Sequence, residues 1–157
     1  YLYIYMSKSE KEVEKCFNYY KKHIISNLGE KGLYDTTIEE NCRRLFKSKW
    51  IACVSHDKMR NENGYQILNT SGSKSKVGIH WVGIVQTDKI IYVYDSFGRN
   101  YSDILKTLSK LAKKYKKSIK EADKDPEQFG NSEICGSLCI AWLLCVKQFG
   151  IRKAMLI

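Results

Sequence analysis

The sequence predicts a single α+β domain in which helices flank a central β-sheet. Two observations predict this fold class: helical patterns lie at both ends of the chain, and the region between them consists of short β-branched and aromatic runs. A third is size, because 157 residues with 43% hydrophobic content suit one compact core. We therefore expect residues 1–157 to form one domain.

Two helices are predicted in the amino-terminal region. Residues 7–10 have the pattern of a capping box, and the apolar residues that follow fall on one face as far as Gly29. A second capping box at residues 37–40 predicts a helix with Ile38 and Cys42 facing inward.

The middle of the chain predicts the sheet. Its apolar runs are separated by Gly, Ser, Asn and Asp, which are typical turn residues. Residues 86–88 have the composition of a hairpin turn that joins the last two strands. The predicted strands are residues 50–55, 65–70, 77–85 and 89–95.

Two further helices are predicted toward the carboxyl terminus. Ser102 and Asp103 predict the start of a long amphipathic helix that reaches residue 120. Residues 135–148 are apolar on nearly every side, so we expect that helix to lie buried at the centre of the domain. The apolar stripe of the long helix consists of Ile104, Leu108, Leu111, Tyr115 and Ile119.

The chain is strongly basic, with 27 Lys+Arg against 17 Asp+Glu and a net charge of +10. Such a surplus favours polyanions such as nucleic acid, and plain solubility accounts for it equally well. Lysines on the long predicted helix concentrate the charge and form either a solvated face or a DNA contact. The candidate DNA-contacting lysines are Lys106, Lys110, Lys113, Lys114 and Lys117.

The six cysteines are expected to be reduced thiols in an intracellular or virion-borne protein. Residues 1–6 are apolar but too short for a signal peptide, and no Cys-x-x-Cys pair indicates a zinc site. The longest strongly apolar stretch, residues 138–146, is too short to span a bilayer, so we expect no membrane association.

Cys135 is the candidate nucleophile. Asn131 or Ser132 is a suitable N-cap, which would place Cys135 in the first turn of the buried helix. The helix dipole and the free amides there stabilise a thiolate and can donate to an oxyanion, and Gly136 would leave room for a substrate backbone. Most cysteines near apolar helices are simply core residues, which is how we interpret Cys139 and Cys145.

His80 is the candidate base among three histidines. His23 is interpreted as a surface or boundary residue, and His56 as a loop residue without the second pair that a metal site needs. His80 is a lone polar residue in an apolar strand and therefore needs a partner. The next strand ends in Asp95, which a hairpin at residues 86–88 would bring level with His80. Without the cysteine, a satisfied core pair would be the simpler interpretation.

Three motifs carry a resemblance to a known family. They read GIHW at residues 78–81, YDSFG at residues 94–98 and QFGNSEICGSLC at residues 128–139. In this order and spacing they resemble the adenovirus proteinases and, more distantly, the SUMO-protease-like enzymes, whose papain-like site is permuted. The resemblance covers most of residues 6–149 and is least clear over residues 30–60.

The resemblance implies a role for each site residue. Cys135 would be the nucleophile and His80 the general base, with Asp95 orienting the imidazole. The Gln128 side chain would join the Cys135 backbone amide in the oxyanion hole. The implied α+β fold has a central buried helix that carries the cysteine, packed on a mixed sheet that carries the histidine and the acid. The implied reaction is endoproteolysis of capsid and core precursors during virion maturation, with no cofactor required for the chemistry.

The sequence departs from the adenoviral pattern in two respects. Asp95 stands where the adenoviral enzyme has glutamate, although the wider clan uses aspartate. Residues 96–134 contain no cysteine for the disulfide-tethered peptide cofactor of that enzyme, whereas a DNA activator remains compatible with the basic charge. Residues 1–5 are an extension, a tag, or an edge strand that replaces the peptide cofactor.

These observations predict a monomeric maturation protease in the virion and in the reducing interior of the infected host cell, encoded by a large DNA virus or a virophage. One alternative is a protease for ubiquitin-like proteins, which would use the same site on another substrate. An alternative of a different class is a basic DNA-binding structural protein with a dead site on a protease-like scaffold.

Overall fold

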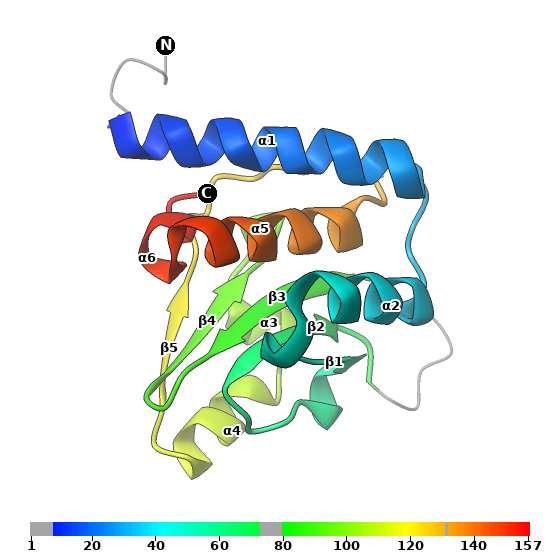
Figure 1. Cartoon of the computed structure of the whole chain (residues 1–157). Helices are drawn as coiled ribbons and strands as arrows, with labels where there is room; N and C mark the ends of the chain where they lie inside the picture. The colour runs from blue at the N-terminus through cyan, green and yellow to red at the C-terminus, as the bar shows by residue number, and fades with distance from the viewer. Residues whose placement is uncertain (1–7, 73–79, 131) are drawn as a thin grey trace.

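The computed structural model describes residues 8–72, 80–130 and 132–157. Within these ranges, helices cover both faces of a five-stranded mixed sheet (Figure 1), which confirms the predicted α+β class. The strands lie in chain order across the sheet. Their bounds are β1 Trp50–Ser55, β2 Gly64–Asn69, β3 Trp81–Gln86, β4 Ile90–Tyr94 and β5 Ser118–Glu121.

The strands β2, β3 and β4 are antiparallel neighbours, whereas β1 runs parallel to β2 and β5 runs parallel to β4. The predicted hairpin between β3 and β4 is confirmed, and Thr87 N donates to Ile90 O at 2.9 Å within its turn. β3 begins one residue after His80 and β4 ends one residue before Asp95, so neither side chain belongs to the strand in which it was predicted. The predicted strand residues 77–79 lie outside the described ranges.

The two amino-terminal helices are α1 (Lys8–Leu28) and α2 (Asp35–Phe46). α1 ends as predicted at Gly29, which has φ +89° and donates its N–H to Ile25 O at 2.8 Å. Ser7 of the first predicted capping box is outside the described ranges. The second predicted capping box is wrong, because α2 begins at Asp35, before Thr37, and Tyr34 precedes it without a side-chain cap. Its inward residues Ile38 and Cys42 are buried as predicted.

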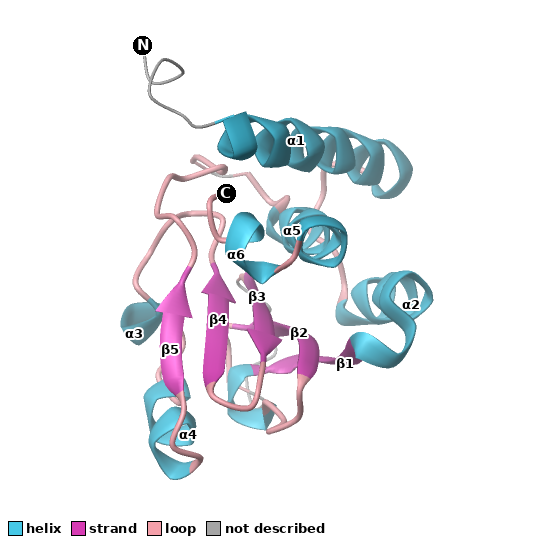
Figure 2. Ribbon diagram, turned by 60° about the vertical axis from the view of Figure 1, so that its left-hand side comes forward, coloured by secondary structure: helices cyan, strands magenta, loops and turns pink. Residues whose placement is uncertain are grey.

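The buried helix α5 (Cys135–Phe149) confirms the prediction for residues 135–148. α5 packs against one face of the sheet, with α2 beside it. α1 packs on the outer side of α5. α4 (Leu108–Lys114) covers the opposite face of the sheet (Figure 2). Trp142 of α5 stacks on Tyr94 of β4 at 5.2 Å between ring centroids, and its Nε1 donates to Ala154 O at 3.0 Å. The chain then continues through Gly150 into the short helix α6 (Ile151–Ala154).

The central strands are buried on both faces, so the domain has a core on each side of the sheet. Ile67, Val85 and Tyr94 face the core under α5, whereas Leu68, Ile84 and Val93 face the core under α4. This arrangement explains the continuous apolar runs in β2, β3 and β4. The α5 core is the one that reaches the amino-terminal end of α5.

The long helix predicted for residues 102–120 is wrong. The segment consists of α3 (Tyr101–Ile104), α4 and the edge strand β5. Lys116 adopts φ +53°, which reverses the chain after α4, and residues of β5 then pair with β4. Pairing of Ile119 with Ile91 overrides the local helical period. Tyr115, predicted to face inward, is 39% exposed, and Leu105 and Ala112 are buried instead.

Two single-turn 3₁₀ helices, Lys47–Lys49 and His56–Lys58, flank β1. In the described part of the chain, no helix is both long enough and apolar enough to cross a bilayer.

Candidate active site

Three segments that are distant in sequence meet at one end of the sheet. Because β3 and β4 are antiparallel, the residue before β3 lies beside the residue after β4, and the start of α5 lies over both. A cleft of about 1140 Å³ opens at this point. Its lining includes His80, Trp81, Arg99, Gln128 and Cys135. The structure therefore brings together the residues that the sequence motifs singled out.

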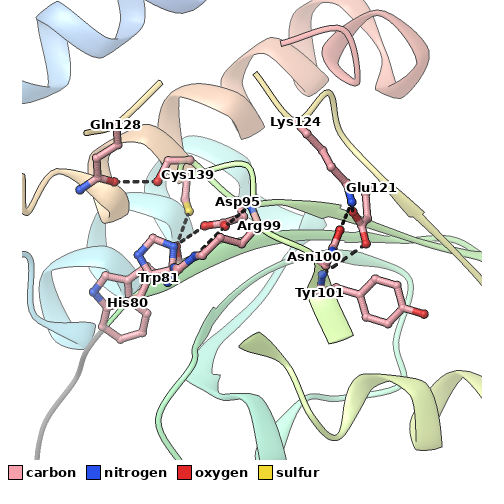
Figure 3. Close-up of polar contacts among 11 residues, drawn as sticks. His80, Trp81, Asp95, Arg99, Asn100, Tyr101, Glu121, Lys124, Gln128 and Cys139 are labelled. Carbon is pink, nitrogen blue, oxygen red and sulfur yellow. Dashed lines mark hydrogen bonds and ion pairs between the residues drawn. The ribbon is translucent and has the colours of Figure 1, made fainter. Parts of the chain in front are cut away.

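His80 and Asp95 form a buried pair. His80 Nε2 bonds Asp95 Oδ1, and the two residues are 4% and 6% exposed (Figure 3). Burial alone would lower the pKa of His80, but the hydrogen bond to Asp95 and the interaction with Cys135 outweigh burial and raise the pKa above its ordinary value. Burial would likewise raise the pKa of Asp95, and the bonds from His80 and Arg99 instead hold that pKa below its usual range. The pair therefore favours imidazolium against carboxylate.

Cys135 is the first residue of α5, as predicted. The residue that precedes the helix is Ile134, which gives no side-chain cap, so Ser132 is not the N-cap; Asn131 lies outside the described ranges. Cys135 is 6% exposed and lines the cleft, and its interaction with His80 helps to raise the pKa of the imidazole. Since Nε2 of His80 faces Asp95, Nδ1 is the ring nitrogen that remains for the thiol.

Gln128 is a buried amide at the edge of the cleft, 2% exposed. Its Oε1 accepts a hydrogen bond from Ser96 Oγ at 2.7 Å, and its Nε2 donates to Ser132 O. The amide is thus fixed at both ends. A primary amide nitrogen carries two N–H donors, so the second donor of Nε2 is left for a ligand.

Gly136 allows close packing at the start of α5, and its predicted function of admitting a substrate backbone stays a prediction. A Cβ at this position would lie 3.2 Å from Ile38 Cδ1 and 3.3 Å from Trp81 Cδ1. Glycine therefore lets the indole of Trp81 pack against α5. Trp81 Nε1 donates to Leu33 O at 3.1 Å, which ties the cleft wall to the segment between α1 and α2.

The remaining thiols agree with the core interpretation. The six cysteines all lie within the described ranges and are unpaired. Burial raises the pKa of Cys145 to about 12 and that of Cys139 well above its ordinary value. Cys139 Sγ also bonds Trp81 O at 3.4 Å. Both side chains are therefore neutral core thiols.

The other two histidines lie away from the cleft lining. His23 is exposed and stacks on Tyr19, with ring centroids 6.2 Å apart. His56 Nδ1 lies 2.9 Å from Thr107 Oγ1 in the 3₁₀ turn after β1. Over the described ranges, no group of three or more His, Cys, Asp or Glu side chains is placed to hold a metal ion.

Two residues of the site were missed from the sequence. Arg99 binds Asp95 Oδ2 through its backbone N–H at 2.9 Å and its Nε at 3.2 Å. Ser96 orients Gln128. The signal for Arg99 is its position four residues after Asp95 across a turn, where Gly98 has φ +68° and donates to Asp95 O at 2.9 Å. No local pattern indicates the partner of Ser96.

Comparison of the chain with models of known protein families found no match, and a search of curated proteins also found none.

Proposed function

We propose that this chain is a cysteine endopeptidase. The observation that carries the proposal is the buried His80–Asp95 pair beside a thiol at the first position of a helix, on the wall of a cleft. A structural ion pair would not need the thiol, and a core cysteine would not line the cleft. The three together have the composition of a Cys-His-Asp triad.

The proposed reaction begins with transfer of the Cys135 proton to His80, whose raised pKa favours the imidazolium form. The thiolate attacks the substrate carbonyl carbon and forms a C–S bond, and the carbonyl oxygen becomes an oxyanion. Asp95 keeps the imidazolium oriented through its Oδ1. His80 then protonates the leaving amine as the C–N bond breaks, and water hydrolyses the thioester in a second round through the same base.

The oxyanion has two proposed donors. The N–H of Cys135 is one of the first four amides of α5, and these amides have no acceptor within the helix. The second donor is the free N–H of Gln128 Nε2, since that side chain is held at the edge of the cleft. Both donors are fixed before substrate binds, which is the arrangement that stabilises developing charge most strongly.

The resemblance of the three motifs to adenovirus proteinases favours capsid and core precursor proteins as substrates, and a monomer acting in the virion and the infected host cell. A protease for ubiquitin-like proteins would use the same residues. Cleavage of a ubiquitin or SUMO fluorogenic conjugate, set against cleavage of a co-encoded capsid protein, separates the two functions.

The basic surface supports a DNA activator as part of the same proposal. Lys106, Lys110, Lys113 and Lys114 are exposed on and before α4. Lys117 is engaged, because its Nζ donates to Thr87 O at 2.8 Å. α4 covers the sheet face opposite α5 (Figure 2), so DNA bound there would leave the cleft open. The alternative is a DNA-binding structural protein in which Cys135 is unreactive.

The test is alkylation of the folded protein with iodoacetamide between about pH 5 and pH 9, which spans the ordinary histidine and cysteine pKa values. Peptide mass spectrometry follows each cysteine separately, so Cys139 and Cys145 act as internal references. We expect Cys135 to react at least about 100-fold faster than either reference at neutral pH, since only thiolates react. His80→Ala should remove most of this advantage.

Equal labelling of Cys135 and Cys139 in the folded wild type would contradict the proposal. Cys135→Ala provides the control for peptide cleavage, since it removes the nucleophile and leaves the buried pair in place. Duplex DNA is added in parallel. Faster labelling with DNA supports the activator, and an unreactive Cys135 with tight DNA binding supports the structural-protein alternative.

A further inference from the structure

Arg99 binds Asp95 on the oxygen that His80 does not use. Asp95 Oδ1 bonds His80 Nε2, whereas Oδ2 accepts the Arg99 backbone N–H at 2.9 Å and the Arg99 Nε at 3.2 Å. Figure 3 shows both partners beside the carboxylate. Each oxygen therefore has its own partner, and the plane of the carboxylate is fixed.

The Arg99 guanidinium also lies over the face of the Phe97 ring. Its central carbon lies 5.0 Å from the centroid of the Phe97 ring, and the His80 ring centroid lies 5.2 Å from the same ring. Phe97 thus contacts both residues that bind Asp95. Stacking on an aromatic face restricts the Arg99 side chain to the orientation that reaches Asp95.

The two partners differ sharply in exposure. The Arg99 side chain is 44% exposed and lines the cleft, while the Asp95 side chain is 3% exposed. An ordinary surface ion pair contributes little to stability because solvent competes for both charges. Here the carboxylate is buried, and the loss of one charged partner leaves it under-compensated. The Arg99–Asp95 ion pair should therefore contribute more than an exposed surface pair does.

We infer that Arg99 is a positioning residue, which keeps Asp95 ionised and turned so that Oδ1 faces His80. The inference rests on the proposed function, because the imidazole that Asp95 orients is the proposed base. When the guanidinium is removed, the Arg99 backbone N–H still bonds Oδ2. Oδ2 of Asp95 then keeps one neutral donor, the backbone N–H, and loses the charged guanidinium. Protonation of Asp95 becomes easier as a result.

A protonated Asp95 cannot stabilise the imidazolium of His80. Arg99→Met should therefore raise the titration midpoint of the Asp95 carboxyl, since removal of an adjacent cation disfavours the charged form. The acid limb of the Cys135 alkylation rate should move upward in pH, and the loss of rate should be largest at the acid end, because Asp95 stays ionised near neutrality in both proteins. Arg99→Lys restores the charge and should recover much of the loss.

The experiment is a double-mutant cycle on the Cys135 alkylation rate and on peptide cleavage, with wild type, Arg99→Met, Asp95→Asn and the double variant. If Arg99 acts through Asp95, Arg99→Met has no further effect in the Asp95→Asn background. The matched control is Arg152→Met, which removes an exposed arginine of α6. The Asp95 carboxyl is followed by ¹³C NMR, which does not depend on activity.

Each outcome has a distinct meaning. An unchanged Asp95 titration in Arg99→Met, or full additivity of the two substitutions, overturns the positioning role while leaving the proposed function intact. A changed Asp95 titration with a wild-type Cys135 that fails to react overturns the proposed function, and the positioning role of Arg99 in catalysis with it. A thermal unfolding midpoint that falls equally in Arg99→Met and Arg99→Lys, with pH profiles unchanged, assigns Arg99 a purely structural role.

Discussion

Ser96 Oγ donates a hydrogen bond of 2.7 Å to Gln128 Oε1, and Ser96 directly follows Asp95 in the chain. The backbone carbonyl of Ser96 also accepts the N–H groups of Glu127 at 2.9 Å and Gln128 at 3.1 Å. Asp95, which bonds His80, is thus followed directly by Ser96, which holds the Gln128 amide proposed for the oxyanion hole. Any movement of this segment would disturb both functions together.

Ser96→Ala is expected to impair turnover more than it impairs the nucleophile. The substitution removes the acceptor-side anchor of the Gln128 amide, so Nε2 loses its fixed direction. We expect kcat to fall about 10-fold or more, in the range seen when an oxyanion donor is weakened. Cys135 alkylation, which forms no oxyanion, should change little. The measurement compares peptide cleavage with alkylation in the same preparation.

Ser137→Ala is the matched control for Ser96→Ala. Ser137 is equally buried in α5, and its Oγ has no hydrogen-bond partner among the described residues. Removing this hydroxyl should leave stability unchanged or slightly increased, whereas loss of the Ser96 bond costs about 1 kcal/mol. Equal effects of the two substitutions on kcat would show that Ser96 does not act through Gln128.

Glu127→Gln is expected to stabilise the protein at alkaline pH. Burial raises the pKa of Glu127 to about 8, and neighbouring Asp125 and Asp123 add to the shift against the bond that Tyr94 donates. The folded state therefore binds this proton more tightly than the unfolded chain, so stability falls as pH rises between the two pKa values. The Gln side chain of the variant cannot ionise, so the variant does not lose stability as pH rises through this range.

The difference in free energy of unfolding between Glu127→Gln and wild type should be near zero below the ordinary carboxyl pKa. It should grow to roughly 2 kcal/mol in favour of the variant above about pH 8, an amount discounted for partial solvent contact. Urea unfolding at a series of pH values measures it. Glu30→Gln, at an exposed position after α1, should show no such trend. A constant difference across pH would contradict the prediction.

Gly83→Ala is expected to destabilise the domain by overpacking the interface between β3 and α5. A Cβ at Gly83 would lie 2.9 Å from Trp142 Cε3, so the indole or the strand must shift. We expect the free energy of unfolding to fall by about 1–3 kcal/mol. Gly72→Ala is the control, since a Cβ there meets no atom of the described residues within 4 Å. A stable Gly83→Ala would mean that Trp142 can move without cost.

The basic surface before and on α4 is expected to bind duplex DNA in a salt-dependent manner. Combined substitution of Lys106, Lys110 and Lys113 by Glu should lower the affinity at least about 10-fold and reduce the slope of log K against log salt by about 3. Fluorescence anisotropy of a labelled duplex at several salt concentrations measures both quantities.

The control for the basic surface reverses three exposed lysines of α1, namely Lys11, Lys15 and Lys22. The two triple variants have the same net charge, so equal loss of affinity would indicate a diffuse effect of charge. A local contact requires that only the variant of the α4 surface loses binding.

The sequence predicted the parts of the fold in which one local pattern dominates. α5 was recognised because its apolar residues occupy nearly every side, which few exposed helices allow. β1 was predicted with its observed bounds because Trp50, Ile51 and Val54 suit a strand. His80 was found because a polar side chain among apolar neighbours needs a partner.

The remainder depended on contacts that no local pattern contains. Leu108, Leu111 and Ile119 fit a helical period, yet the strand that contains Ile119 forms because the edge of β4 is available to it. The reversal at Lys116 carries no glycine or proline to indicate a break. The partnership of Ser96 with Gln128 spans 32 residues and required the fold.

The division of labour between α5 and the cleft rim bears on how this protein could acquire new specificities. Cys135, the proposed nucleophile, shares its helix with several of the most deeply buried side chains that the structure describes, so substitutions along α5 are expected to lower stability. The rim is different, because much of it comes from the connections at residues 31–34, 128–130 and 132–133, where Tyr34 and Phe129 are 78% and 72% exposed. Substitutions confined to those connections would change which substrates fit the cleft. They would leave the proposed catalytic residues and the buried helix α5 unchanged.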